Sequence, residues 1–479
     1  MSKEVHLMWD DSVLTIAPSS PALEKFLTYR EKKLVQDPKV PWKRVTKVTV
    51  NPLYKVVSEQ KEYTVIQTMQ GMWLKVKTFL ESNGCDVRFY DMRITFPKPR
   101  LDLMCGFRFK QEELLTSFLH TNCSGLLGAP TRYGKTTLIK NTLRAFPNVH
   151  TVVTAPGADL VKQLYEDVKE ALPHREVKLI GAGSTKSPCD DVNVVSMDSL
   201  HKCDAPACKL LLIDEPHACV TDSRLPELVK FDKARRIGFG ATLKGRFDQR
   251  DILIEALIGP VIAERTFQEA VAEGAVCPLI VYMVVIPLAG VCDDRDRAYK
   301  THLFKGERVA KAVRWICHEL LPQDWQTLIF IKNEDQAEYF LDWVGQDGTI
   351  AMAKRMTKTE RENMMERMRG DEVKRCLASE IYAQGVTFNH VRALINLSGG
   401  GASTSTIQKP GRLAEVRPDK KCGVVFDFFF TPGTGKGNGV QALYRESLAR
   451  VKAYAEKGYE IIYVDSYNAL ESSFKSKAI

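Results

Sequence analysis

The amino-acid sequence predicts an α/β protein with two tandem parallel-sheet domains and a small α+β domain in front of them. Three observations lead to this prediction. Short β-rich runs alternate with helical segments over residues 101–275, and the alternation resumes over residues 276–479. Strand–helix alternation is typical of a parallel sheet covered by helices on both faces. The first 100 residues follow another pattern, and a chain of 479 residues has room for about three domains.

Residues 1–100 are expected to form the α+β domain. Hydrophobic alternation predicts four strands, over residues 5–9, 13–17, 47–57 and 62–68. A helix is expected to begin at Pro21 and to run over residues 21–34, because its apolar residues recur near helical spacing. A second helix is expected over residues 72–82, and Asn83-Gly84 should end it.

Most of the surplus positive charge of the chain lies in this first domain. The whole chain has a net charge of +9, and residues 1–100 hold 17 Lys and Arg against 11 Asp and Glu. Such a surface suits a nucleic-acid backbone. A solvated basic surface without a partner explains the same charge, and both interpretations stay open at this stage.

The two following domains are predicted strand by strand. In the region 101–275 the expected strands are 125–128, 151–154, 177–180, 192–196, 210–213 and 236–240. In the region 276–479 they are 279–286, 326–331, 393–397 and 424–429. Helices are expected between them, over residues 307–320, 335–344, 359–369 and 442–455.

Composition excludes several classes of protein. Hydrophobic residues make up 44% and charged residues 27%, which is ordinary for a globular protein and excludes a disordered, collagen-like or fibrous chain. The longest apolar run, residues 278–291, is shorter than the ~20 residues that a membrane-spanning helix needs. The N-terminus shows no signal peptide, so we expect a cytoplasmic protein with no membrane partner.

The twelve cysteines show no repeated spacing, which favours reduced thiols. The densest cluster of potential metal ligands fits no standard zinc spacing and is interpreted as small buried thiols; its members are His201, Cys203, Cys208, His217 and Cys219.

The segment GLLGAPTRYGKTTLIK, residues 125–140, carries the sharpest chemical signal. An apolar strand runs into a loop, and a helix follows. Backbone N–H groups of such a loop and the positive end of the helix suit a triphosphate. Lys135 is expected to neutralise the β- and γ-phosphates, and the Thr136 hydroxyl to bind Mg²⁺. The expected ATP contacts of this segment are Pro130, Thr131, Arg132, Tyr133, Gly134, Lys135, Thr136 and Thr137.

The segment LLLIDEPHA, residues 210–218, carries the second signal. Its apolar strand ends in Asp214-Glu215, and acidic side chains at the carboxyl edge of a parallel strand face the crevice where ligands bind. We expect Asp214 to hold Mg²⁺, directly or through water. We expect Glu215 to orient and polarise the attacking water.

The motif Asp214-Glu215-Pro216-His217 resembles the DEAH-type box of superfamily 2 helicases, and further segments follow in the order of that family. The resemblance covers residues from about 101 to 470. It implies two RecA-like domains that use ATP and Mg²⁺ to act on nucleic acid, with a monomer sufficient for activity. It also implies that His217 links the triphosphate site to the second domain.

Several segments of the first RecA-like domain resemble family motifs. Phe109-Lys110-Gln111 resembles the upstream motif whose glutamine, here Gln111, reads adenine. Gly240-Ala241-Thr242 resembles the motif that couples hydrolysis to strand movement, with Thr242 as the coupling residue. Two further segments resemble strand-contacting motifs and imply nucleic-acid contacts at Pro156, Gly157, Gln163, Ser196 and Met197.

The second RecA-like domain resembles the family in three segments. Residues 327–332 resemble its first motif and imply a nucleic-acid contact at Lys332, while residues 385–388 imply an ATP contact at Gly385. Residues 408–412 resemble the Gln-x-x-Gly-Arg motif, which implies an ATP contact at Gln408 and a catalytic Arg412. An arginine in that role stabilises charge on the transferred phosphoryl group.

The chain departs from the family pattern at two positions. Arg132 stands where the phosphate loop of the family usually has glycine. Glu415 stands where the family usually has a second arginine, and Arg417 lies two residues further on as a candidate replacement that would contact ATP.

The resemblance extends to phage UvsW-type and RecG-like enzymes in residues 255–283, and more loosely to the UvsW N-terminal domain in GMWLKVKTFLESNG. It implies an ATP-dependent DNA helicase or translocase that remodels forks and Holliday junctions in replication, recombination or repair. Three alternatives remain: an RNA helicase, a duplex translocase subunit of a larger machine, and a non-hydrolysing nucleic-acid-binding protein.

A second glycine-rich segment, TPGTGKGNG over residues 431–439, imitates a phosphate loop. It lacks Ser or Thr after Lys436, so no hydroxyl is available for Mg²⁺. We expect a flexible loop, since its glycines disfavour the start of a helix.

Overall fold

The computed structural model describes residues 4–37, 40–59, 63–121, 123–242, 248–345, 348–351, 356–379, 390–401, 406 and 409–479. The chain forms two compact units. The first comprises residues 1–130 and 134–265, and the second comprises residues 131–133 and 266–479. In the described part of the chain, no helix combines the length and apolar character that crossing a membrane requires.

The first unit begins with a five-stranded sheet in the order β5-β6-β2-β1-β7. Its strands are β1 (Glu4–Trp9), β2 (Val13–Ala17), β5 (Tyr54–Glu59), β6 (Thr64–Met69) and β7 (Asp86–Asp91). The expected hairpin of β1 and β2 is confirmed, and Asp10 closes it by accepting the backbone N–H groups of Ser12 and Val13. The helix expected over 72–82 is confirmed as α2 (Trp73–Ser82), which ends at Asn83.

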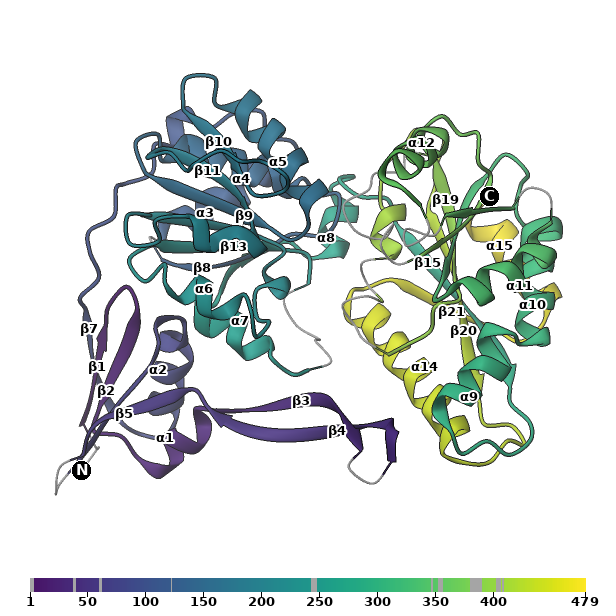
Figure 1. Ribbon diagram of the computed structural model, residues 1–479, viewed down its shortest axis with the longest axis horizontal. Helices are drawn as coiled ribbons and strands as arrows, with labels where there is room; N and C mark the ends of the chain where they lie inside the picture. The colour runs from purple at the N-terminus through teal and green to yellow at the C-terminus, as the bar shows by residue number, and fades with distance from the viewer. Residues whose placement is uncertain are drawn as a thin grey trace. The chain divides into compact units, whose positions relative to one another are not determined.

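The helix expected over residues 21–34 is wrong beyond its first turns. Helix α1 spans only Pro21–Phe26, and Thr28–Asp37 forms strand β3, paired antiparallel with β4 (Val40–Pro52). Pairing with a β-branched partner strand thus overrides the local helical spacing. Figure 1 shows β3 and β4 as a long two-stranded ribbon, and among the described residues they form a sheet of their own.

The second sheet of this unit is parallel and has the order β10-β11-β9-β12-β13-β8-β14. Its strands are β8 (Gly125–Gly128), β9 (Thr151–Ala155), β10 (Val177–Ile180), β11 (Val192–Ser196), β12 (Leu210–Asp214), β13 (Arg235–Gly240) and β14 (Val261–Glu264). Its helices are α3 (Gln111–His120), α4 (Lys135–Ala145), α5 (Ala158–Ala171), α6 (Leu225–Val229) and α7 (Asp251–Ile258) (Figure 1). The six strands expected here are confirmed, and β14 is an addition.

The two sheets of the first unit share one hydrophobic core, which runs from Val5 to Ile258. Gln70 donates its side-chain N–H to the carbonyl of Ile258 at 3.1 Å, and Lys75 pairs with Glu255 at 2.6 Å. Between them Gly71 packs so closely on α7 that a Cβ there would lie 2.0 Å from the Glu255 carbonyl oxygen. Only glycine therefore allows this approach.

The second unit is built on a parallel sheet in the order β17-β18-β16-β19-β20-β15-β21. Its strands are β15 (Leu279–Pro287), β16 (Gln326–Ile331), β17 (Gly348–Ala351), β18 (Arg375–Ser379), β19 (Val391–Asn396), β20 (Gly423–Thr431) and β21 (Glu460–Val464). Its helices include α8 (Phe267–Ala272), α9 (Arg295–Tyr299), α10 (Glu307–Trp315), α11 (Glu334–Val344), α12 (Lys358–Arg369), α14 (Asn438–Glu456) and α15 (Tyr467–Lys477). The four expected strands are confirmed.

The expectation for residues 431–439 needs correction. The segment is hydrogen-bonded rather than open, since Gly435 and Lys436 donate their N–H groups to the carbonyls of Leu288 and Gly290 at 3.1 and 2.9 Å. Helix α14 also begins inside it, at Asn438. Gly437, with φ of 102°, lies just outside the helix, where its conformational freedom helps the chain to enter.

Candidate active site

The loop between β8 and α4 has two residues with a left-handed backbone. Arg132 has φ of 74° and Gly134 has φ of 97°, after which α4 begins at Lys135. A side chain at Gly134 would clash, since a Cβ there would lie 2.4 Å from Nε2 of Gln111. The expected contacts Pro130, Thr131 and Tyr133 complete this loop. Thr136 and Thr137, both half-buried, lie in the first turn of α4, at the positive end of the helix.

Gln111 lies directly under this loop. It begins α3, is 1% exposed, and accepts the backbone N–H of Arg108 at 2.9 Å through Oε1. Asn141 on α4 fixes the preceding segment, because its amide accepts from the N–H of Cys105 at 2.8 Å and donates to the Cys105 carbonyl at 3.0 Å. Sequence reasoning missed Asn141, since a polar residue inside a helix gives no local sign of its partner.

Asp214 ends the fully buried strand β12 and is itself 8% exposed. Its Oδ1 is buried and has no hydrogen-bond partner within the described ranges. Burial, reinforced by the neighbouring charge of Glu215, raises the pKa of Asp214 to about 7. An unsatisfied buried carboxylate oxygen is costly, so this position favours a cation or a proton.

Glu215 has φ of 54° and meets two basic side chains. Its Oε1 lies 2.9 Å from Nζ of Lys135, and its Oε2 lies 3.3 Å from Nδ1 of His217. Burial alone would raise the pKa of Glu215, but the charges of Lys135 and His217 outweigh burial and hold that pKa well below its usual value. Glu215 is therefore ionised at neutral pH.

This arrangement fits a magnesium-bound triphosphate. Among the described residues, no group of three or more His, Cys, Asp or Glu side chains could hold a metal ion. Mg²⁺ needs no such cage, because it usually keeps waters and substrate phosphates beside one or two protein oxygens. The Asp214 carboxylate with its unpartnered oxygen and the Thr136 hydroxyl supply that kind of donor, and Lys135 supplies charge for the phosphates.

Thr242 lies two residues after β13, which is hydrogen-bonded between β12 and β8 in the sheet. It is 2% exposed, and its hydroxyl oxygen is buried without a hydrogen-bond partner in the described part of the chain. Thr242 therefore places a second buried polar group without a hydrogen-bond partner in the described residues at the same edge of the sheet as Asp214.

The expected nucleic-acid contacts of the first unit divide into two groups. Gly157 and Gln163 are exposed and Pro156 is half-buried, at the start of α5. Ser196 and Met197 are 7% and 1% exposed, and Met197 packs in the hydrophobic core. The Met197 side chain therefore belongs to the core, and the expected nucleic-acid contacts of this group stay predictions.

The remaining site residues lie in the second unit. Arg412 is half-buried in the 3-10 helix η8 (Pro410–Leu413). Arg417 donates to Asp419 at 3.1 Å and lies 3.1 Å from Nδ1 of His390. Lys332 is exposed just after β16. Gly385 and Gln408 lie outside the described residues.

The five potential metal ligands between residues 201 and 219 do not form a metal site among the described residues. Cys208 and Cys219 are buried, whereas His201 is exposed. Burial raises the pKa of the Cys208 thiol to about 12, so this sulfur is protonated at neutral pH and is a poor metal ligand.

Two families match the chain. Residues 105–245 match the family described as "Type III restriction enzyme, res subunit", and residues 311–416 match "Helicase conserved C-terminal domain". A protein of Sulfolobus islandicus filamentous virus named "Putative helicase 22" is 20% identical over 422 residues, covering 78% of this chain and 71% of that protein.

Two solved structures with TM-scores above 0.5 share the fold, and a third is reported beside them. S. cerevisiae Dbp5 bound to RNA and ADP BeF3 has a TM-score of 0.52 at 15% identity, covering 76% of this chain and 92% of Dbp5. The Type ISP restriction-modification enzyme LlaBIII bound to DNA has a TM-score of 0.55 at 13% identity, covering 81% of this chain and 34% of LlaBIII. T4 UvsW aligns with 97% of this chain and 99% of its own length, with a TM-score of 0.41 at 14% identity.

Proposed function

The chain is an ATP-dependent helicase of superfamily 2, and from this premise we propose that its substrate is DNA and that it remodels branched DNA such as forks and four-way junctions. The observation that carries the DNA assignment is the β3–β4 ribbon. Residues 28–52 contain seven Lys and Arg but two Asp and Glu, which is most of the surplus charge of the N-terminal domain.

The ribbon combines charge with a suitable shape. Arg30, Lys33 and Lys47 are exposed on it, together with Val48 and Val50 at 51% and 64% exposure. The major groove of B-DNA admits a two-stranded ribbon, whereas the deep, narrow major groove of A-form RNA does not. We therefore assign the ribbon to a DNA duplex beside the strand on which the motor acts.

The part of β3 that contains Glu31 and Lys32 contacts Asp248 and Arg250 of the same unit. The backbone N–H of Lys32 donates to the carbonyl of Asp248 at 3.0 Å. Buried Glu31 and the more exposed Asp222 both pair with Arg250. These contacts support a mechanical link between Arg250 and the ribbon, because a shift of Asp248 and Arg250 would also move Lys32 and Glu31.

For hydrolysis, we assign Lys135 to the triphosphate, and Thr136 and Asp214 to Mg²⁺, which when bound neutralises charge on the phosphates. Glu215 orients the attacking water and accepts its proton. Phosphate oxygens compete for Lys135, so Glu215 loses part of its ion pair and becomes a stronger base. Arg412 stabilises charge on the transferred phosphoryl group.

The first experiment compares ATPase stimulation and strand separation on single-stranded, duplex, forked and four-way DNA and on matching RNAs. We expect the greatest stimulation with forked or four-way DNA. Greatest stimulation by RNA would contradict the proposal and favour an RNA substrate like that of Dbp5. Stimulation by duplex without strand separation would favour a translocase, in line with the restriction-enzyme family match.

The second experiment tests the ribbon with the double variant Arg30→Gln/Lys47→Gln. Because each lost phosphate contact lowers the slope of log affinity against log salt by about 0.9, we expect a slope smaller by about two on duplex or forked DNA. Lys209→Gln/Lys233→Gln makes the same charge change at exposed positions beside the amino ends of β12 and β13 and is the matched control. Equal slopes for the two variants would remove the ribbon from the DNA interface.

A further inference from the structure

The short helix η8, which carries Arg412, is held by its surroundings. It spans four residues, and the N–H of Arg412 donates to the carbonyl of Lys409 at 3.2 Å. A 3-10 turn of this length has few hydrogen bonds of its own. The position of the Arg412 backbone therefore depends on what holds Lys409 and the far end of the turn.

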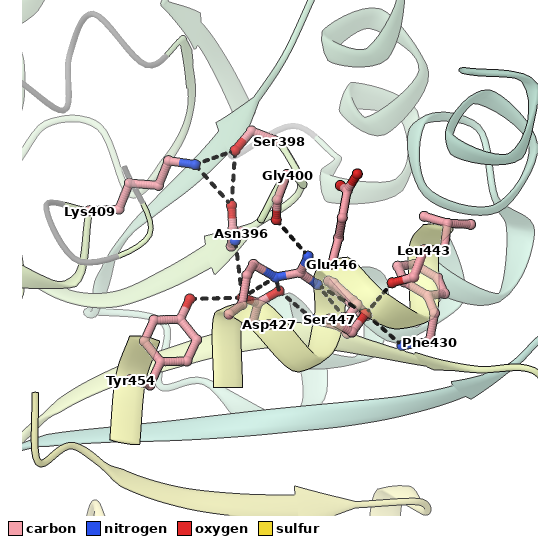
Figure 2. A network of polar contacts seen from close by, with 12 residues as sticks. Asn396, Ser398, Gly400, Lys409, Asp427, Phe430, Leu443, Glu446, Ser447 and Tyr454 are labelled. Carbon is pink, nitrogen blue, oxygen red and sulfur yellow. Dashed lines mark hydrogen bonds and ion pairs between the residues drawn. The ribbon is translucent and has the colours of Figure 1, made fainter. Parts of the chain in front are cut away.

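Lys409 is 2% exposed, and its ammonium group is turned into the second unit. Nζ donates to the hydroxyl of Ser398 and to Oδ1 of Asn396, the latter at 3.4 Å. The Ser398 hydroxyl donates in turn to Oδ1 of Asn396 at 3.0 Å. Figure 2 shows the three side chains converging at the end of β19.

From Asn396 the contacts continue to a buried ion pair. Its amide donates to Oδ2 of Asp427 at 3.1 Å, and the same oxygen lies 3.0 Å from Nε of Arg450. The Tyr454 hydroxyl donates to Asp427 at 2.7 Å. Asp427 and Arg450 are 1% and 2% exposed, and Arg450 also donates to the carbonyl of Gly400 at 2.9 Å.

The other end of η8 has a second buried lysine. Nζ of Lys420 donates to the carbonyl of Leu413 at 2.6 Å and to the carbonyl of Val391, at the start of β19, at 3.3 Å. Both ends of the turn are thus fixed to β19, one through the side chains of Asn396 and Ser398 and the other through the backbone of Val391.

We propose that Lys409 is a positioning residue for Arg412, and that Asn396 and Asp427 form the support through which β20 and α14 fix it. This inference rests on the proposed role of Arg412 in hydrolysis. Lys409 has no contact with the substrate in this scheme and acts through the backbone of the turn.

The burial of a lysine at position 409 supports a role in positioning Arg412 rather than a role in stability alone. A buried charge with its hydrogen-bond partners adds little net stability compared with a well-packed apolar side chain. It does restrict geometry, because each polar partner must stay within hydrogen-bond distance. A catalytic arginine profits from this restriction, since a shift of ~1 Å at a reacting group can cost ~100-fold in rate.

The test is a double-mutant cycle of Lys409→Met and Arg412→Ala, read as kcat and KM for ATP with saturating DNA. We expect Lys409→Met to lower kcat by about 10- to 100-fold with KM changed less than about threefold. In the Arg412→Ala background the same substitution should lower kcat by less than about twofold, since groups that act as one unit are not additive. Losses that multiply would overturn the inference.

Two further variants separate the possible failures. Gln326→Leu removes another buried polar side chain of this unit, one that donates to Met368 and Val373 at 2.9 Å, and should leave kcat within about twofold when compared at equal folded fraction. Ser398→Ala, a smaller change at the Lys409 ammonium, replaces Lys409→Met if that variant does not fold. Full turnover by Arg412→Ala alone would contradict the proposed function; loss there with normal turnover by Lys409→Met would overturn only the positioning role.

Discussion

Each compact unit holds a buried aspartate, Asp214 in the first and Asp427 in the second, and the two carboxylates differ in their hydrogen-bond partners. In the first unit, Oδ1 of Asp214 has no hydrogen-bond partner in the described ranges. In the second unit, both oxygens of Asp427 are satisfied, Oδ1 by the N–H of Phe428 at 2.7 Å and Oδ2 by Tyr454 and Asn396, with Arg450 near both.

This difference in hydrogen-bond partners distinguishes a site that binds a ligand from a polar network that fixes the geometry of its neighbours. A polar cluster that lacks partners is unstable until a ligand completes it, which suits Asp214 and its expected Mg²⁺. A cluster whose members satisfy each other is complete without a ligand and fixes geometry, which suits Asp427 behind Arg412. Substitutions in the first cluster should therefore affect activity more than folding, and substitutions at Asp427 should affect folding first.

The largest expected effect is on stability. Asp427→Ala leaves Arg450 buried without its carboxylate, and loss of one partner of a buried pair costs about 3–5 kcal/mol. We expect the free energy of unfolding of the second unit, measured by urea titration, to fall by about that amount.

The control is Asp419→Ala, which removes an aspartate of the same unit whose side chain is 46% exposed and which pairs with Arg392 and Arg417. It should unfold near the wild-type urea midpoint. Equal destabilisation by the two variants would mean that the buried Asp427 network contributes no more to the free energy of unfolding than the exposed ion pairs of Asp419.

The second effect is on turnover. Lys135→Ala removes the ammonium group expected to neutralise the phosphates, and we expect DNA-stimulated ATP hydrolysis to fall by about 10²–10³-fold. DNA affinity, measured by fluorescence anisotropy without nucleotide, should stay within about twofold because the phosphate loop holds no DNA contact in this scheme.

Lys140→Ala, one turn further along the same helix, is the matched control and should keep its turnover. Unchanged hydrolysis in Lys135→Ala would place the phosphate site elsewhere. If Lys135→Ala did not fold, the cluster around Asp214 would resemble the Asp427 network in affecting folding first, contrary to the expected difference.

The smallest effect concerns pH. The pKa of Asp214 is raised by burial to about 7, so the unfolded chain holds fewer protons on this residue between its ordinary pKa and about pH 7. Stability from this group is therefore lost as pH rises toward about 7. Asp214→Asn removes the cost of ionisation and should raise the Tm of the ligand-free protein at about pH 8 by about 3 °C or more.

At about pH 5 the gain in Tm should be clearly smaller, because Asp214 is then mostly protonated in the folded protein. Asp190→Asn, an exposed aspartate of the same unit, is the control for both pH values. An equal Tm gain at both pH values would show that ionisation of Asp214 is not the cause.

Local sequence was sufficient where the chemistry is contiguous. The apolar run that ends in Asp214-Glu215 and the loop that ends in Gly134-Lys135 each need only a strand, a turn and a neighbouring helix. Parallel strands with helical connections bring the carboxyl ends of β8 and β12 to one edge of the sheet, so Lys135 and Glu215 meet although 80 residues separate them.

Other features were decided only by the tertiary structure. Residues 28–34 have a local pattern that fits a helix, yet pairing with β4 makes them part of strand β3. Asn396, Asp427 and Arg450 carry no motif, and their network exists because β19, β20 and α14 pack together. The physical reason is one of range: a turn or cap is fixed by neighbours in sequence, whereas the partner of a buried polar group is chosen by the packing of distant segments.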